Sequence, residues 1–144
     1  MSEARALIAG MIRVVVGALV SDGRVLLVHR DPNKRARPGL WDLPGGVIEA
    51  GESELGALAR ELHEELGVEV STGSVSHLGR VTAGPADEPA LLSAWLVREW
   101  QGTPANVAPE EHDQIAWFGL AELPPPPHVA VRTPLLNAMR SGPG

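Results

Sequence analysis

The feature that most constrains this fold is an amphipathic helix predicted over residues 54–66. Leucines recur there at helical spacing and form one apolar stripe: Leu55, Leu58, Leu62 and Leu66. Ser53 suits the N-cap position, and Gly67 suits the residue after the last turn. A helix with one apolar stripe must pack it against another layer, so the rest of the chain has to supply that layer.

The remaining segments predict mostly β-structure. Runs of β-branched and apolar residues indicate strands at 12–20, 25–29, 75–82, 91–100 and 115–119, with a short strand running into a glycine turn at 41–46. Asp22-Gly23 predicts a hairpin turn, and Thr133-Pro134 predicts the start of a final helix over about 133–141. Few helices on a sheet indicate an α+β or a mixed α/β class. We find no linker or repeat, so residues 1–144 are expected to form a single domain.

Composition narrows the function classes. The chain has no cysteine, which excludes a disulfide framework, a thiolate metal site and a cysteine nucleophile. With 12 basic and 18 acidic residues the net charge is −6, so stable binding of nucleic acid is not expected. The apolar run at 6–20 is interrupted by Arg13 and falls short of the ~20 residues of a membrane span. We therefore expect a cytoplasmic protein that does not bind a membrane.

Three carboxylates crowd one side of the helix. Glu61, Glu64 and Glu65 are three and four residues apart, where like charges cost about 0.2–0.5 kcal/mol per pair. Arg60 is placed on another side from Glu65, and we expect no basic residue of the helix to offset the repulsion. Oxygen ligands at this density suit Mg²⁺ or Mn²⁺. The alternative is a solvated acidic face.

The residues around these carboxylates carry a longer pattern. Residues 46–68 read GVIEAGESELGALARELHEELGV. This resembles the Nudix box, which is Gly, five residues, Glu, seven residues, then Arg-Glu-apolar-any-Glu-Glu-any-Gly-apolar. Every specified position matches, and WDLPGG at 41–46 extends the resemblance more loosely.

Membership of the Nudix family implies a fold and a chemistry. The fold is an α/β/α sandwich around a mixed sheet, with the box as loop–helix–loop, and the reaction is hydrolysis of a diphosphate linked to another moiety, with Mg²⁺ or Mn²⁺. The resemblance implies that Glu61, Glu64 and Glu65 bind metal or activate water, that the Gly45 carbonyl joins them, and that Glu52 pairs with Arg60. We favour Glu61 as the general base, with Glu65 and Glu111 as alternatives.

Further ligands are expected outside the box. Many family members add one more carboxylate, for which Glu110, Glu111 and Asp113 are candidates, and Glu111 fits best because it lies six residues before Trp117. A solvated acidic turn is the alternative. The basic residues Lys34, Arg35 and Arg37 could clamp phosphates or simply solubilise their loop, and Trp41 could form a pocket rim. We assign no role to the five histidines.

The resemblance leaves several functions open. A (d)NTP pyrophosphohydrolase of MutT type leads, because the chain has no tyrosine to match diadenosine polyphosphate hydrolases and lacks the coenzyme A signature. An ADP-ribose or nucleotide-sugar pyrophosphatase is the runner-up, with Pro85 near the associated proline position. A non-catalytic nucleotide-binding module is less consistent with a complete box, and a calcium-binding acidic helix lacks the loop ligand spacing of an EF-hand. The expected partner is a small nucleoside phosphate, and a homodimer is left open.

Overall fold

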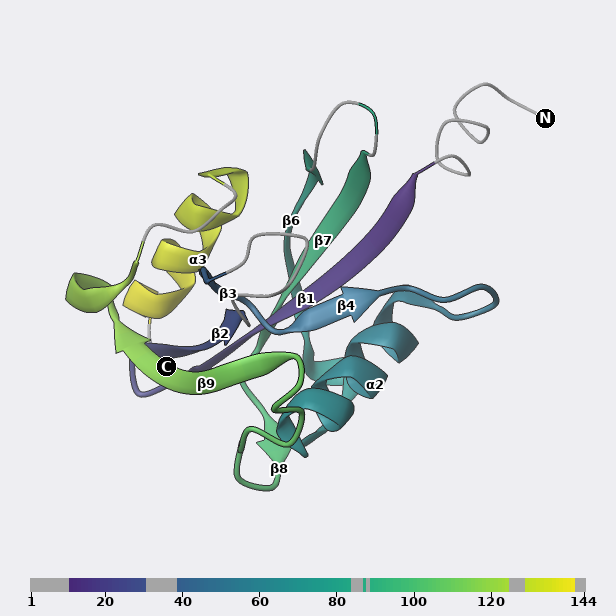
Figure 1. The fold of residues 1–144 in the computed structure, drawn as a ribbon. Helices are drawn as coiled ribbons and strands as arrows, with labels where there is room; N and C mark the ends of the chain where they lie inside the picture. The colour runs from purple at the N-terminus through teal and green to yellow at the C-terminus, as the bar shows by residue number, and fades with distance from the viewer. Residues whose placement is uncertain (1–10, 31–38, 84–86, 88, 125–128, 142–144) are drawn as a thin grey trace.

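The computed structural model describes residues 11–30, 39–83, 87, 89–124 and 129–141 (Figure 1). The strands are β1 Ile12–Ser21, β2 Arg24–Arg30, β3 Trp41–Asp42, β4 Gly45–Val47, β5 Glu69–Val70, β6 Ser76–Ala83, β7 Ala90–Val97, β8 Trp100–Gln101 and β9 His112–Gly119. The helices are α2 Glu54–Leu66 and α3 Val129–Ser141, with short 3₁₀ turns at Thr72–Ser74 and Leu120–Glu122. The three basic residues considered as a phosphate clamp, Lys34, Arg35 and Arg37, lie outside these ranges.

Strand β1 organises a mixed sheet. It runs parallel to β7 along eight residue pairs and antiparallel to β4 on its other edge. Only its last two residues pair with β2, which then diverges to pair with β3 and β9 (Figure 1). Strand β6 pairs with β7, while β5 and β8 form a separate two-stranded sheet. The predicted mixed α/β class is confirmed.

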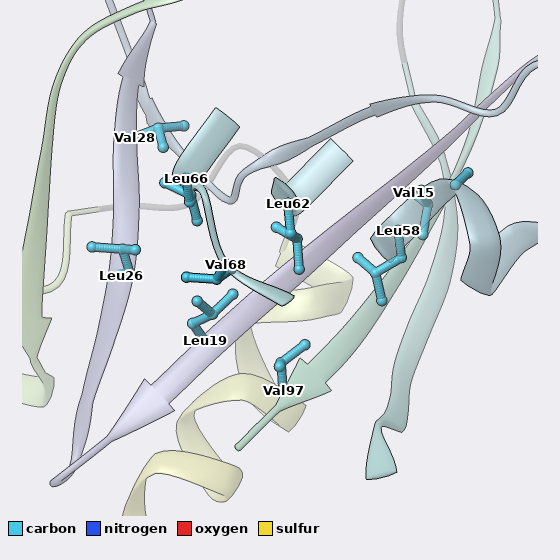
Figure 2. Close-up of a cluster of buried hydrophobic side chains, with 10 residues drawn as sticks. Val15, Leu19, Leu26, Val28, Leu58, Leu62, Leu66, Val68 and Val97 are labelled. Carbon is cyan, nitrogen blue, oxygen red and sulfur yellow. The ribbon is translucent and has the colours of Figure 1, made fainter. Parts of the chain in front are cut away.

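Alternation along β1 explains why helices cover both faces. Val15 and Leu19 join the cluster that contains the α2 leucines (Figure 2). Ala18, one position away from Leu19, packs instead with Leu135 and Met139 of α3. Successive side chains of a strand point to opposite faces, so a strand that is apolar throughout residues 14–20 needs a cover on each side. Helix α2 covers one face and α3 the other.

Local signals in the sequence are confirmed for the first hairpin and for α2. Asp22 and Gly23 both have positive φ, 52° and 72°, as a two-residue type I′ turn requires. The Ser53 hydroxyl accepts the Gly56 N–H at 3.0 Å, and Gly67 ends α2 in the left-handed region. Helix α2 spans the predicted residues. Both described helices, α2 and α3, have 13 residues, and neither meets the length and apolarity needed to cross a bilayer.

Four predicted boundaries are wrong, because tertiary packing or strand pairing overrides the local pattern. Helix α3 begins at Val129, so Pro134 lies inside it rather than in its first turn. The run 91–100 divides into β7 and β8, because Trp100–Gln101 pairs with β5. The glycines at 45–46 belong to β4, which pairs with β1, rather than to a turn. Strand β9 begins at His112, three residues before the predicted start.

Candidate active site

The glycine pair Gly45-Gly46 lies between β1 and α2 with no room for a side chain. A Cβ on Gly45, whose φ is 153°, would lie 2.0 Å from the Val15 carbonyl oxygen. A Cβ on Gly46 would lie 2.6 Å from the Glu61 carboxylate. Glycine at both positions therefore lets strand β4 approach the carboxylate-bearing side of α2.

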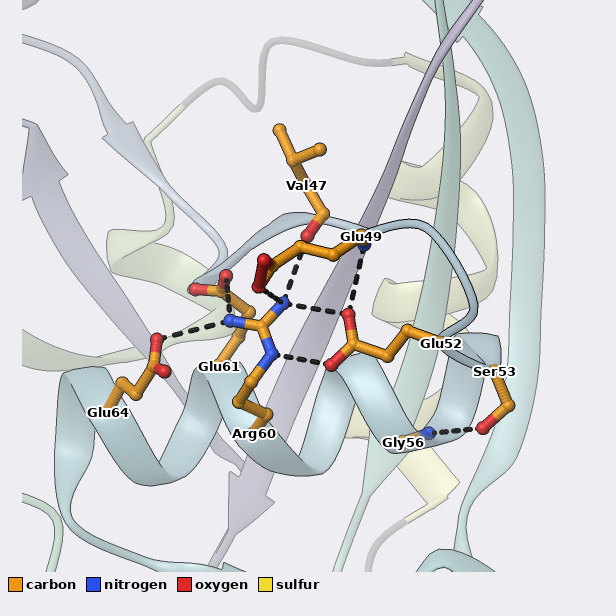
Figure 3. Close-up of polar contacts among 8 residues, drawn as sticks. All are labelled: Val47, Glu49, Glu52, Ser53, Gly56, Arg60, Glu61 and Glu64. Atoms are coloured by element: carbon orange, nitrogen blue, oxygen red, sulfur yellow. Dashed lines mark hydrogen bonds and ion pairs between the residues drawn. The ribbon is translucent and has the colours of Figure 1, made fainter. Parts of the chain in front are cut away.

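Arg60 joins the loop before α2 to the helix itself. Its guanidinium donates to both carboxylate oxygens of Glu52, with Nη2–Oε1 at 2.9 Å, and to the Val47 carbonyl at 3.1 Å (Figure 3). Glu52 also accepts the Glu49 N–H at 3.0 Å. The Arg60 hydrogen bond, followed by the Glu49 one, holds the pKa of Glu52 at about 2. The predicted contact between Glu52 and Arg60 is confirmed.

The expectation that no basic residue offsets the acidic side of α2 is wrong. Arg60 lies four residues before Glu64 and contacts it at 3.2 Å, and the same nitrogen, Nη1, contacts Glu61 at 2.9 Å (Figure 3). A single nitrogen can reach both because each Nη of a guanidinium carries two N–H donors. Arg60 thus compensates two of the three crowded carboxylates, and hydrogen bonding to Glu52 raises its own pKa further above the usual value.

Glu65, the third carboxylate, is buried without such compensation. The residue is 5% exposed, and its Oε1 has no hydrogen-bond partner among the described residues. Burial raises the pKa of Glu65 far above its usual value, and the adjacent Glu61 raises it further. A hydrogen bond from the Gly45 backbone opposes the shift without cancelling it. The Glu65 carboxyl is therefore held in the protein interior against β4 (Gly45–Val47), the glycine strand.

The loop that precedes β9 also reaches the Glu65 carboxyl. His112 is 4% exposed, and its Nε2 lies 3.2 Å from Glu65 Oε1. Glu111 is exposed, and its charge adds to the rise in the Glu65 pKa. The structure thus brings Glu111, the favoured extra carboxylate, toward the box. Sequence reasoning gave His112 no role, although its position directly after Glu111 was a usable signal.

The other acidic candidates of this loop lie elsewhere. Asp113 contacts His29 Nδ1 at 2.7 Å, and Glu110 is exposed in the preceding turn. His29 in turn packs edge-on against Trp41, with ring centroids 5.0 Å apart. Neither acid is placed against Glu65 by a contact in the described part of the chain.

Trp41 lines a cavity on the α3 face of the sheet. Apolar side chains of β1, β2, β7 and α3 form most of its wall, and Asp42 adds a buried carboxylate. Leu43, another lining residue, lies two positions before Gly45. The predicted rim residue therefore belongs to a pocket that approaches the glycine strand from the other side of the sheet.

A second, partly buried carboxylate lies at the start of α2 and was not anticipated. Glu54 Oε2 accepts the Ser93 hydroxyl and the Trp95 indole N–H, both at 2.7 Å, and Arg80 lies at 3.2 Å. Burial alone would raise the pKa of Glu54, but these hydrogen bonds outweigh it and the net shift is downward. His77 contacts the same Ser93 hydroxyl at 3.0 Å. This network joins the helix start to β6 and β7.

The donor set at Glu65 fits a hard divalent cation. Glu65 Oε1, which has His112 Nε2 at 3.2 Å but accepts no hydrogen bond among the described residues, lies beside Glu61 and near Glu111. Carboxylate oxygens are the preferred ligands of Mg²⁺ and Mn²⁺. Within the described residues, however, no three acidic or histidine side chains converge on one point. The reason is visible in Figure 3, where Glu61 and Glu64 turn toward Arg60.

Comparison with known proteins places this site in a family. Residues 11–139 match a family model described as the NUDIX domain. A CTP pyrophosphohydrolase of Escherichia coli is 36% identical over 130 residues, 89% of this chain and 90% of that protein. A putative 8-oxo-dGTP diphosphatase of Mycobacterium tuberculosis is 41% identical, covering 76% and 74%. The crystal structure of a MutT NUDIX hydrolase from Burkholderia pseudomallei superposes with TM-score 0.76 at 32% identity, covering 86% and 95%.

Proposed function

The chain belongs to the Nudix family and is a hydrolase acting on pyrophosphate bonds, and we propose that its substrates are nucleoside or deoxynucleoside triphosphates. Water would attack phosphorus, and the products would be the nucleoside monophosphate and pyrophosphate. The single observation that carries this proposal is the buried Glu65 carboxyl, held beside Glu61 and against Gly45. Family members generally use divalent metal ions, and we propose Mg²⁺ or Mn²⁺ here.

The residues proposed to hold the cation are Glu61, Glu64, Glu65, Glu111 and the carbonyl of Gly45. When bound, such an ion neutralises phosphate oxygens and lowers the pKa of water. Glu65 would then no longer be a buried acid without a counter-charge. The side chains of Glu61 and Glu64 would have to leave Arg60 at least in part, because both now lie within 3.2 Å of its Nη1.

Glu61 is the proposed acceptor of the water proton. Its carboxylate lies beside Gly46, where a Cβ would come within 2.6 Å of it, and so faces the glycine strand and Glu65. A general base contributes typically 10²–10⁴-fold to a rate when it is held within reach of the proton. Glu65 and Glu111 stay as alternatives, since Glu65 adjoins Glu61 and the charge of Glu111 acts on Glu65.

Glu52 and Arg60 are proposed to orient the site. Their bidentate pair, together with the Val47 carbonyl, ties the glycine strand to the helix one turn away from Glu64. The base of the nucleotide is proposed to enter the cavity lined by Trp41, because that cavity adjoins the glycine strand and combines an apolar wall with the buried Asp42. The names of the two curated relatives favour triphosphate substrates.

A nucleotide panel tests this proposal. Purified protein should release pyrophosphate from one or more of CTP, dCTP, dGTP and 8-oxo-dGTP with Mg²⁺ and should be inactive in EDTA. ADP-ribose and a nucleotide sugar belong in the same panel. Faster turnover of either one would replace the triphosphate assignment, and binding without turnover of any compound would indicate a non-catalytic module.

A further inference from the structure

The segment 105–112 is fastened to the carboxyl end of α2 by its own backbone. The Ala105 N–H donates to the Leu66 carbonyl at 3.0 Å, and the Val107 N–H donates to the Glu65 carbonyl at 3.1 Å. The last carbonyls of a helix have no partner within it, and an external donor satisfies them. The segment therefore serves as a cap for the same helical turn that carries Glu65.

One side chain closes this segment on itself. Asn106, which lies between the two donating residues, uses Nδ2 to donate to the His112 carbonyl at 2.9 Å. The N–H groups of Glu111 and His112 both donate to the Ala108 carbonyl, at 2.9 and 3.2 Å. These bonds fix the path of the chain from the helix cap to the first residue of β9. The backbone of Glu111 lies on that path, through its N–H bond to Ala108.

The end of the segment returns to Glu65 through a side chain. His112 Nε2 lies 3.2 Å from Glu65 Oε1, and both residues are at most 5% exposed. Two independent links, one through backbone carbonyls and one between side chains, thus hold residues 105–112 to α2. Glu111, next to His112, is placed near Glu65 by both.

We propose that Asn106 and His112 are positioning residues that set Glu111 beside Glu65. The proposal rests on the function proposed above only in taking Glu65 and Glu111 as parts of one site. Asn106 acts through the segment, since its amide bonds the His112 backbone and not Glu111 itself. His112 acts on Glu65 directly and limits where its carboxylate can lie.

Asn106→Ala is the first test, with Gln114→Ala as its matched control. Both changes delete a side-chain amide in the same region, but Gln114 is exposed and lies two residues beyond the segment. Asn106→Ala should lower kcat about 10-fold and weaken Mn²⁺ binding to the nucleotide-free protein, as loss of an outer partner of a metal site does. KM for the nucleotide and all values for Gln114→Ala should stay near wild type.

Hydrogen exchange of the metal-free protein separates positioning from general stability. In Asn106→Ala the amides of Ala105 and Val107 should exchange faster, while those of β1 and β7 keep their wild-type protection. Faster exchange throughout the sheet would mean that Asn106 only stabilises the fold. Faster exchange in the segment with unchanged kcat and Mn²⁺ affinity would show that the segment does not position Glu111. Either result would overturn the proposal.

His112 is tested by two replacements. Glutamine keeps a nitrogen donor near Glu65, whereas phenylalanine keeps the ring shape without one. His112→Gln should retain most of the Mn²⁺ affinity, and His112→Phe should lose about as much as Asn106→Ala. If both variants lost Mn²⁺ affinity equally, His112 would serve packing alone and would not be a positioning residue. If the wild type turned over none of the nucleotides, the proposed function would be contradicted. Hydrogen exchange and Mn²⁺ binding would still decide whether Asn106 and His112 position Glu111.

Discussion

Helix α2 carries two glutamates withdrawn from solvent, the partly buried Glu54 at its start and the buried Glu65 near its end, and their surroundings are opposite. Glu54 is met by the Ser93 hydroxyl, the Trp95 indole and Arg80, and its pKa is lowered. Glu65 is met by another acid, Glu61, and its pKa is raised. The difference teaches that a carboxylate in the interior that is met by hydrogen-bond donors joins elements of the fold. A buried carboxylate without them costs stability, and we propose that Glu65 is kept because a bound cation uses it.

The largest effect should follow from Glu65→Gln, which keeps the shape of the side chain and removes its charge. We expect turnover of the best nucleotide to fall by about 10²–10⁴-fold, because a ligand or base of the reaction is lost. Steady-state kinetics at saturating Mg²⁺ measures this. If turnover fell less than about threefold, Glu65 would not take part in the reaction and would not differ from Glu54 in function.

Arg60→Ala should have the next largest effect. It removes the tie between the glycine strand and α2 and leaves Glu52 without its partner, so activity should fall about 10–100-fold and the melting temperature should fall too. A double-mutant cycle with Glu52→Gln sharpens the test. The combined loss should be smaller than the sum of the single losses, as expected for residues in contact. Additive losses would mean that the pair does not form in solution.

Glu54→Leu should change stability rather than activity. The variant leaves the buried Ser93 hydroxyl and Trp95 N–H without their acceptor, which costs about 1–3 kcal/mol per group in the free energy of unfolding. At temperatures below its own melting temperature, the variant should keep an activity within about twofold of that of the wild type. Urea denaturation and kinetics on the same preparation measure both. An activity loss that matches Glu65→Gln would show that both ends of α2 serve the reaction.

The smallest expected effect is a pH dependence at Glu54. Its folded pKa lies below the unfolded value, so its contribution is complete above the unfolded value of about 4.3 and is lost as pH falls through the folded pKa. Glu54→Gln should therefore lose less stability than wild type between pH 5 and pH 3. Urea midpoints across this range provide the measurement, and parallel curves for the two proteins would contradict the assigned shift.

The sequence predicted the parts of this fold that depend on neighbouring residues. The α2 boundaries follow from Ser53, the leucine spacing and Gly67, all within fifteen residues. The hairpin follows from Asp22-Gly23. The start of α3 did not follow, because a local Thr-Pro signal at 133–134 competed with a helix that begins at Val129 and buries Val131.

The candidate site was predicted in its residue types but not in its charge balance. The contact between Arg60 and Glu64 follows from their spacing of four residues and was overlooked. The burial of Glu65 depends on β4 and on residues 105–112, which approach from distant parts of the chain. The partners of Glu54 lie 26 to 41 residues away, so no local pattern marks them.

Thermal unfolding of wild type and Glu65→Gln, each in EDTA and in Mn²⁺, tests most directly whether Glu65 is kept for a cation. In EDTA the variant should melt higher than wild type, because it removes an acid from an unfavourable interior position. In Mn²⁺ at about 100 times Kd, wild type should gain about 2.7 kcal/mol and the variant much less, so their order reverses. A variant that melts lower than wild type in both conditions would show that Glu65 is a structural residue like Glu54.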